Sequence, residues 1–454
     1  MKMHLIYAIR FRRPALVVWM LIAGGLAASA DAQLTSGLIS QGDAASAGLK
    51  RAWFARAEVN PARSHVVDWV LADDELLILT DLGVLQALDA NTGQTLWTTQ
   101  FGNPNYPSLG PGSNGEYVAV INGSTLYLLD RKSGKIQSQR KIGGAPGAAP
   151  ALGKDHVFVP TLTGLIEGYP LEPNAAEYER WFYQSYGNTM VAPLVTPHSV
   201  VWSTDRGYLY VSGSTTPGVR YRLEAGDEFD ARAAFQEPLI YAVTRSGELF
   251  ALDEESGALR WRYMTGFPTD RAPAAVGTRL FLTSDEPMLH CLDAKTGLPQ
   301  WQVPGIDQFA AATKNHVYGV DRFGTIHILN IADGSPVGRI ANDGSLKALV
   351  NDQTDRLFLI SEAGLVQCLH EIGADKPTHY GAAPKTEAPS GAGQEPAAEQ
   401  TGESQPATAP AVNAPAEEPA ATTENPFSAG AQEAAPPAKE ESSFGTGDEN
   451  PFEQ

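Results

Sequence analysis

Histidines that recur at similar places along the chain are the first residues to consider for chemistry, because neutral imidazole is a common metal ligand. His290 and His327 are candidates for a metal-binding pair. Both stand, however, at a position that Gln86, Tyr127 and Phe250 occupy in similar segments elsewhere. Three further histidines share the start of another recurring segment: His156, His198 and His316. Equivalent positions of a repeat lie in different units of a fold, so we expect neither group to bind a metal.

The cysteines, Cys291 and Cys368, are the candidates for redox or zinc chemistry. Two cysteines are too few for a disulfide framework or for a cysteine-based zinc site. They stand at the position that Ala87 and Ala251 occupy in similar segments, with a whole repeat between them. A disulfide requires that the Cα atoms of its two cysteines lie within about 7 Å of each other. We therefore expect two buried free thiols.

An acidic run, EAGDEFD over 224–230, is the candidate for calcium binding. Its carboxylates lack the spacing of a calcium-binding loop, in which alternate positions supply the ligands. We expect a solvated loop between two repeats. The sequence thus predicts no metal site, no cofactor and no catalytic residue.

Aromatic residues recur with the repeat, and a set of rings can stack on a carbohydrate or on a flat cofactor. Because each ring stands at one equivalent place per repeat, the symmetry of the fold would hold the rings far apart. We predict that each ring packs against the neighbouring unit instead. The predicted structural residues are Trp53, Trp97, Trp181, Tyr221, Trp261 and Trp301.

Aspartates recur at the ends of the same segments, each followed by a Thr-Gly or Ser-Gly pair. An aspartate at this place in a turn accepts hydrogen bonds from the backbone N–H groups that follow it. The predicted turn caps are Asp89, Asp130, Asp253 and Asp293.

The elements that position these residues belong to a repeat of about 40 residues. Three copies align directly: GVLQALDANTGQTLW over 83–97, GELFALDEESGALRW over 247–261 and MLHCLDAKTGLPQW over 288–301. Each copy contains four short segments with apolar residues at alternate positions, separated by turns rich in Gly, Asp and Asn. A period near 40 with four strands per unit is typical of a β-propeller. We predict an all-β fold, an eight-bladed β-propeller of four-stranded antiparallel blades over 49–373, with seven blades as the alternative.

The eighth copy ends before its outer strand, and the N-terminal part of the repeat region supplies a strand without a partner. The segment LKRAWFARAEV over 49–59 resembles an outer strand, with Trp53 at the tryptophan position. We predict that this strand completes the last blade. Closing the ring in this way removes exposed sheet edges that would otherwise promote aggregation.

The N-terminal 32 residues have the features of a secretory signal peptide. A basic start with Arg12 and Arg13 is followed by an apolar run and by two Ala-x-Ala sites. The apolar run is shorter than the ~20 residues that a spanning helix needs, which disfavours the alternative of an uncleaved anchor. No cysteine lies near the predicted cleavage site. We expect cleavage before Gln33, a linker over 33–48, and a periplasmic or envelope protein that is not a lipoprotein.

The C-terminal part of the chain, 374–454, is predicted to be a disordered acidic tail rich in Pro and Ala. It has no apolar periodicity and cannot bury enough surface to offset the entropy of ordering. Two copies of Glu-Asn-Pro-Phe interrupt it and are candidate docking peptides. Their residues are Asn425, Pro426 and Phe427, and Asn450, Pro451 and Phe452. The alternative is a spacer with incidental phenylalanines.

The overall charge narrows the classes of partner. Lys and Arg number 33 against 52 Asp and Glu, giving a formal net charge of −19. Such a surface repels phosphate backbones, so we expect no nucleic-acid partner.

The motif Ala-Leu-Asp-x-x-Thr/Ser-Gly-x-x-x-Trp resembles the repeat of propellers of the pyrroloquinoline-quinone (PQQ)-like family over about 49–373. One branch of that family contains quinoprotein dehydrogenases and another contains BamB-like scaffolds of outer-membrane barrel assembly. Within this resemblance, membership of the enzyme branch would require long insertions, calcium ligands, a catalytic aspartate and adjacent cysteines. Eight blades of about 40 residues leave no room for such insertions, and the cysteines are not adjacent.

The resemblance therefore implies the scaffold branch. We expect a non-catalytic, exported, monomeric propeller that binds envelope or outer-membrane proteins through its rim loops and through the tail. The missing lipoprotein cysteine and the added tail depart from that branch and put membership of a barrel-assembly complex in doubt. The alternatives are a PQQ-dependent dehydrogenase or a quinone-binding remnant of one, and a binder of polysaccharide or peptidoglycan.

Overall fold

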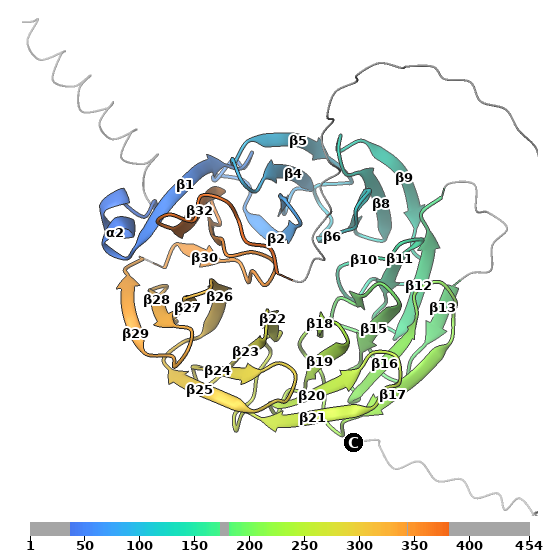
Figure 1. The fold of residues 1–454 in the computed structure, drawn as a ribbon. Coiled ribbons are helices and arrows are strands. Elements are labelled where there is room, and N and C mark those ends of the chain that lie inside the picture. The colour runs from blue at the N-terminus through green and yellow to red at the C-terminus, as the bar shows by residue number, and fades with distance from the viewer. Residues whose placement is uncertain (1–36, 173–180, 343, 381–454) are drawn as a thin grey trace, which may run out of the picture. The chain divides into compact units, whose positions relative to one another are not determined.

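A computed structural model of the chain describes residues 37–172, 181–342 and 344–380. These residues form eight four-stranded antiparallel sheets, which are arranged as the blades of a ring (Figure 1). The predicted eight-bladed all-β propeller is confirmed. The predicted signal peptide and the two Glu-Asn-Pro-Phe segments lie outside the described residues.

The strands run from the inside of each blade to its outside in chain order. Blade 1 consists of β2 (Val66–Ala72), β3 (Glu75–Thr80), β4 (Val84–Asp89) and β5 (Thr95–Gln100), and blade 2 consists of β6 (Ser108–Ser113), β7 (Tyr117–Asn122), β8 (Thr125–Asp130) and β9 (Ile136–Lys141). Blade 3 consists of β10 (Ala151–Leu152), β11 (His156–Pro160), β12 (Leu165–Pro170) and β13 (Trp181–Gln184). Blade 4 consists of β14 (Leu194–Val195), β15 (Ser199–Ser203), β16 (Tyr208–Gly213) and β17 (Val219–Glu224).

The remaining blades follow the same order, except that the last takes its outer strand from the N-terminal side. Blade 5 consists of β18 (Ala234–Gln236), β19 (Leu239–Val243), β20 (Glu248–Asp253) and β21 (Leu259–Met264), and blade 6 consists of β22 (Ala274–Val276), β23 (Arg279–Ser284), β24 (Met288–Asp293) and β25 (Pro299–Pro304). Blade 7 consists of β26 (Gln308–Ala312), β27 (His316–Val320), β28 (Ile326–Asn330) and β29 (Pro336–Ile340). Blade 8 consists of β30 (Leu346–Ala348), β31 (Leu357–Ser361), β32 (Leu365–Glu371) and β1 (Leu49–Arg56).

Blade 8 closes the ring. Strand β1 pairs antiparallel with β32, so that Trp53 lies opposite Cys368 and Arg56 lies opposite Leu365. The sheet order β1-β32-β31-β30 joins the two ends of the propeller (Figure 1). The predicted completion of the last blade by the N-terminal strand is therefore confirmed. A short helix, α2 (Gln41–Ser46), precedes β1 and is capped by the side chain of Ser40.

The hydrophobic core is distributed between neighbouring blades. The middle strands are buried along nearly their whole length, as in β19 and β20, because a blade covers each face. Outer strands such as β21 alternate between half-buried and exposed residues. One cluster joins Leu77 of blade 1 to Val118 of blade 2. Among the described residues, no helix has the length and apolar character needed to cross a membrane.

Candidate binding site between blades

The outer strand of every blade carries one residue at an equivalent place, which we call the outer-strand slot. The slot is defined by the register of the outer strand on the third strand of the same blade. The pairs, written slot residue first, are Trp97 and Ala87, Ser138 and Leu128, Trp181 and Gly168, Tyr221 and Val211, Trp261 and Ala251, Trp301 and Cys291, Gly338 and Ile328, and Trp53 and Cys368.

The size of the slot residue varies inversely with the size of its pair. Each tryptophan lies opposite Ala, Cys or Gly, the tyrosine lies opposite Val, and the small residues Ser138 and Gly338 lie opposite Leu and Ile. Side chains directly opposite in an antiparallel pair share one face of the sheet, so a large ring requires a small neighbour. Cys291 and Cys368 take this small position, and both are buried and free.

Four of the indoles make the same contact with the following blade. Each Nε1 donates a hydrogen bond to a backbone carbonyl in the turn between the third and fourth strands. The bonds run from Trp53 to Ala90 (3.0 Å), from Trp97 to Arg131 (2.7 Å), from Trp261 to Ala294 (3.2 Å) and from Trp301 to Ile331 (3.0 Å). Tyr221 reaches the same turn of blade 5 through its hydroxyl, which donates to Glu254 O at 2.9 Å.

A glycine in each of these turns receives the ring. Gly134 has φ +66°, and a Cβ built on it would lie 2.4 Å from the Trp97 ring. Gly93 stands in the same relation to Trp53. Glycine is therefore required at this position for two reasons: the backbone is left-handed, and the indole approaches too closely for a Cβ.

The recurring aspartates lie at the start of these turns. Oδ1 of Asp89 accepts hydrogen bonds from the backbone N–H and hydroxyl of Thr92, and Asp130 bonds Ser133 in the same way. Asp253 bonds Ser256, and Asp293 bonds Thr296. Hydrogen bonds with Arg260 and Ser256 hold the pKa of Asp253 well below its usual range.

Trp181 differs from the other indoles. It is 1% exposed, but its Nε1 has no hydrogen-bond partner among the described residues. The ring packs edge-on against Phe158, with 4.9 Å between centroids, and against Trp202 at 6.1 Å. Trp181 thus belongs to an aromatic cluster of blades 3 and 4 and lacks the carbonyl contact that its four counterparts make.

Two junctions between blades lack a ring in the slot. At the junction of blades 7 and 8, where the slot residue is Gly338, Ile39 and Ala44 from the N-terminal segment join the apolar cluster that contains Ile328. At the junction of blades 2 and 3 the slot residue is Ser138, and Leu128 and Leu171 belong there to one apolar cluster against which Tyr169 packs. The predicted list of ring residues had no member at either junction.

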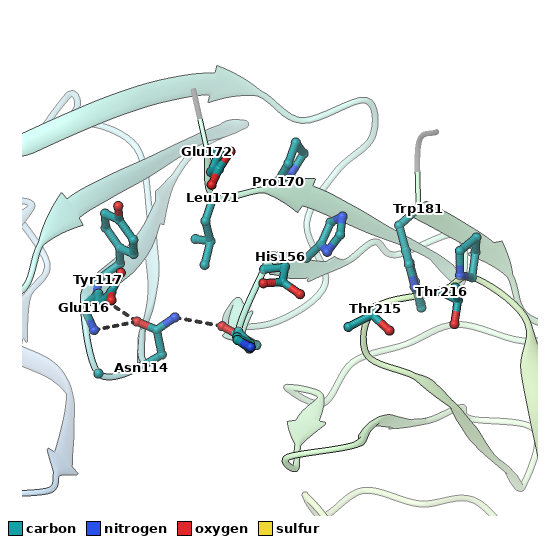
Figure 2. A pocket seen from close by; sticks show the side chains of 15 residues that line it. Asn114, Glu116, Tyr117, His156, Pro170, Leu171, Glu172, Trp181, Thr215 and Thr216 are labelled. Atoms are coloured by element: carbon teal, nitrogen blue, oxygen red, sulfur yellow. Dashed lines mark hydrogen bonds between the residues drawn. The ribbon is translucent and has the colours of Figure 1, made fainter. Parts of the chain in front are cut away.

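A pocket of about 950 Å³ lies at the second of these junctions and extends to blade 4 (Figure 2). Its lining comes from four turns: Asn114–Tyr117 of blade 2, Gly153–His156 and Pro170–Glu172 of blade 3, and Thr215–Pro217 of blade 4, together with Trp181. Asn114 and Tyr117 lie on one side, Trp181 and Thr216 lie on the other, and His156 and Leu171 lie between them (Figure 2).

Hydrogen bonds fix the blade 2 side of the pocket. Oδ1 of Asn114 accepts from the backbone N–H groups of Glu116 and Tyr117, and its Nδ2 donates to Gly153 O at 2.7 Å. This last bond ties blade 2 to blade 3 across the pocket floor. The pocket wall is therefore held in place before any ligand binds.

The polar groups of the pocket are mostly acidic or unpaired. Burial lowers the pKa of His156, so its imidazole is neutral at pH 7, and its Nδ1 has no partner among the described residues. Glu116, Asp155 and Glu172 lie exposed at the rim with a single base, Lys154. The lining thus combines aromatic and apolar walls with an excess of negative charge.

A second hollow of about 750 Å³ lies between blades 5 and 6. Its lining includes Tyr241, Arg260 and Ala294. Here the slot is filled, because Trp261 bonds the Ala294 carbonyl and the Tyr241 hydroxyl donates to the same oxygen at 3.0 Å. A hollow of this kind therefore occurs even where a ring fills the slot.

The histidines and the acidic run do not come together into a metal site. His290 Nδ1 lies 3.0 Å from the hydroxyl of Tyr263, and His327 Nε2 lies 3.0 Å from Asp321, one blade away. In the acidic run, Asp227 accepts from the Ser246 N–H and Phe229 is buried. Within the described ranges, no group of three or more His, Cys, Asp or Glu residues is placed to hold a metal ion.

One further charged group lies toward the centre of the ring. Asp68 stands on β2, the innermost strand of blade 1, and burial raises its pKa to about 6. The charge of Arg232 lowers the pKa of Asp68 and so offsets part of the effect of burial. Burial also raises the pKa of Asp352, and Arg232 lowers it in the same way. The periodicity gave no signal for these groups, because they lie outside the third strands that carry the repeat motif.

The comparison with protein families agrees with the geometry. The model of the family described as "Outer membrane protein assembly factor BamB" matches residues 81–228 and 197–341, and the two matches together cover more than half of the 454 residues.

Curated relatives carry the same description at low identity. The chain is 24% identical to an outer membrane protein assembly factor BamB of Burkholderia pseudomallei over 284 residues, which are 60% of this chain and 64% of that relative. It is 22% identical to the protein of that name from Yersinia pestis over 321 residues, 63% of this chain and 79% of the relative. The chain thus spans less than two thirds of the length of the Burkholderia protein.

Solved structures share the fold. BamB from Moraxella catarrhalis superposes with a TM-score of 0.57 and 17% identity, over 71% of this chain and 99% of that one. The C-terminal WD40 domain of Sif2 superposes with a TM-score of 0.53 and 10% identity, over 71% of this chain and 98% of that domain. These likenesses concern the fold alone. Because the family model covers more than half of its length, the chain belongs to the PQQ-like propeller family described as outer membrane protein assembly factor BamB.

Proposed function

We propose that the chain is an exported, non-catalytic propeller that binds proteins in the cell envelope and acts there as a scaffold, with outer-membrane proteins as its partners. The observation that carries the proposal is the family match over 81–341. Curated relatives named as outer membrane assembly factors support it.

The chemistry of the described residues is consistent with a binding role. The residues that recur from blade to blade bond one another, as Trp97 bonds Arg131 O and Asp130 bonds Ser133. They hold the ring together and leave the loops to vary, and a rigid scaffold with variable loops suits protein binding. Export through the predicted signal peptide, absence of a lipid anchor and a spacer role for the tail are parts of the same proposal.

Co-purification from envelopes tests this proposal. The full chain, its signal peptide included, is expressed with an affinity tag beside a version that ends at Tyr380. We expect both forms to recover the same outer-membrane proteins above an untagged control. Recovery of no envelope protein by either form, or oxidation of alcohols or sugars by the purified chain with added PQQ and calcium, would contradict it.

A further inference from the structure

The outer strands of the propeller have a charge opposite to that of the whole chain. The chain holds 52 Asp and Glu against 33 Lys and Arg, whereas the eight outer strands hold ten bases and a single acid, Glu224. Most of the described acids lie instead in the turns between strands. The ten bases are Lys50, Arg51, Arg56, Arg140, Lys141, Arg220, Arg222, Arg260, Arg262 and Arg339. The outer edge of the ring is therefore positive, although the chain is strongly acidic.

Strand β1, at the outer edge of blade 8, is the most basic of these strands (Figure 1). It contains three bases and no acid in eight residues. Leu49 and Trp53 are buried, and the exposed residues between and after them are Lys50, Ala52, Phe54 and Arg56. An extended chain rises about 3.3 Å per residue, so this exposed row is about 20 Å long. We call these four residues, together with Arg51, the β1 edge.

The β1 edge also carries an exposed aromatic ring. The Phe54 side chain is 56% exposed, and the Arg51 guanidinium lies 5.3 Å from the centre of its ring. Nη1 of Arg51 donates to Ile39 O at 2.7 Å, which holds the guanidinium in place over the ring. Apolar surface and positive charge are thus combined in one small patch.

The bases of the β1 edge are available to a ligand. Lys50 Nζ lies 3.4 Å from Asp375, but the two side chains are 61% and 75% exposed, and an ion pair in water contributes little. Arg56 has no ion pair among the described residues, although Glu58 follows it two positions later. Charges more than about 8–10 Å away are largely screened at physiological salt, so the acidic turns of other blades do not cancel this patch.

We propose that the β1 edge binds the surface of a membrane that contains anionic lipids. Lys50, Arg51 and Arg56 contact lipid phosphates, and Phe54 enters the headgroup region. Bases beside an exposed aromatic ring are the combination that binds proteins to such interfaces. The propeller then contacts the membrane through blade 8 and leaves the loops of both faces open to protein partners. The inference goes beyond the proposed function and does not depend on which partner binds.

Vesicle co-sedimentation tests the proposal with protein-free lipid. The chain 33–454 is used, because the apolar run of the predicted signal peptide would itself bind vesicles. At about 50 mM NaCl we expect Kd to be at least about tenfold lower for vesicles of equal parts phosphatidylglycerol and phosphatidylcholine than for phosphatidylcholine alone. No binding, or equal binding to the two kinds of vesicle, would overturn the proposal. A protein strand that pairs with the free edge of β1 is the alternative occupant, and it predicts this negative result.

A charge variant locates the contact. One base near an anionic surface changes affinity about fivefold, so Lys50→Glu with Arg56→Glu should raise Kd at least about 20-fold. The matched control is Lys141→Glu with Arg262→Glu, which changes the net charge equally on the outer strands of blades 2 and 5. We expect the control to stay within about twofold, with folding of both variants verified by circular dichroism. An equal loss in the control would show that net charge alone matters and would overturn the assignment to β1.

A fluorescent label tests the same contact without any change of charge. Cys291 and Cys368 are buried, so a cysteine placed at Ala52, as Ala52→Cys, is the one that reacts with a nitrobenzoxadiazole reagent. We expect its emission to rise at least about twofold on addition of the anionic vesicles, because the dye leaves water. Leu298→Cys is the control, at a side chain that is 65% exposed on blade 6. No rise at 52, or an equal rise at 298, would contradict the proposed orientation.

This inference and the scaffold function fail separately. The vesicle experiments contain no partner, so a failed co-purification from envelopes would refute the scaffold function and leave the lipid result standing. Conversely, a chain that recovers envelope proteins but ignores anionic vesicles would refute the membrane contact alone.

Discussion

At the scale of residues, the ring depends on a small set of repeated contacts between blades. At four junctions an indole bonds a carbonyl of the next blade and lies on a glycine, as Trp97 does with Arg131 O and Gly134. The Trp97 side chain is large and only 8% exposed, and its indole N–H is paired. These contacts join neighbouring blades, so their loss should weaken the whole propeller.

Substitution of Trp97 by Ala should lower the free energy of unfolding by about 3–5 kcal/mol, the cost of truncating a buried aromatic residue. Urea unfolding followed by circular dichroism measures the change. Ser138→Ala, at the slot of blade 2, is the matched control and should stay within about 0.5 kcal/mol. Equal effects at the two positions would show that the slot has no special role.

Substitution of Gly134 by Ala should be costly for a different reason. The residue has φ +66° and faces the Trp97 ring, so Ala suffers both a left-handed backbone, about 1–2 kcal/mol, and a steric clash. We expect a loss of at least about 2 kcal/mol in urea unfolding. Gly115→Ala, at a glycine with open space and no positive φ, should change little; a loss as large there would refute this explanation.

Asp68 gives a pH dependence that can be predicted in sign. Burial raises its pKa from 3.8 to about 6, so between these values the folded chain holds a proton that the unfolded chain has released. This group therefore makes stability fall as pH rises from about 4 to 6, after which its contribution is constant. Asp68→Asn should flatten that slope and raise stability at pH 7 in urea titrations at each pH. A steeper slope in the variant would contradict the assigned direction.

At the scale of elements, the sequence predicted the strands well because each is a short apolar or alternating segment that ends at a marked turn. The Asp-x-x-Thr/Ser-Gly motif located third strands such as β4 and β24, and Trp53 identified β1 as the missing outer strand. The middle strands are buried because neighbouring blades cover both faces of each sheet, whereas the outer strands alternate between half-buried and exposed residues.

The candidate site was much harder to predict, since its lining comes from turns of three different blades. Ser138 and the altered turn after Pro170 were visible in the sequence, but only the register shows that Ser138 replaces a tryptophan. The unpaired Nε1 of Trp181 depends on side-chain packing that no periodicity reports. Trp181 was grouped with the other indoles because its spacing fits, although it lacks their carbonyl contact.

Removal of β1 tests the closure of the ring at this scale. A mature chain lacking 33–56 leaves β32 as an exposed edge and removes the Trp53 contact with blade 1. Exposed edges promote association between chains. We expect a lower melting temperature and aggregates in analytical ultracentrifugation, whereas removal of 33–36 alone should leave a monomer. A monomeric, equally stable chain without β1 would contradict the closure.

At the scale of the whole molecule, eight blades of similar size form a closed ring whose repeated residues bond one another. The loops differ between blades, and a pocket lies where turns of blades 2, 3 and 4 meet. A scaffold that binds envelope proteins through the propeller is the function that this arrangement and the family membership support best.

Photo-crosslinking in living cells tests that claim most directly. A photo-reactive amino acid replaces Thr216 in the pocket or, as a control on another blade, Thr278 beside the hollow of blades 5 and 6. We expect Thr216 to crosslink to an outer-membrane protein in the full chain and equally in the version ending at Tyr380, with little product from Thr278. Absence of a crosslink from Thr216 would contradict use of this pocket by the partner, and loss of the crosslink when the tail is removed would contradict binding through the propeller.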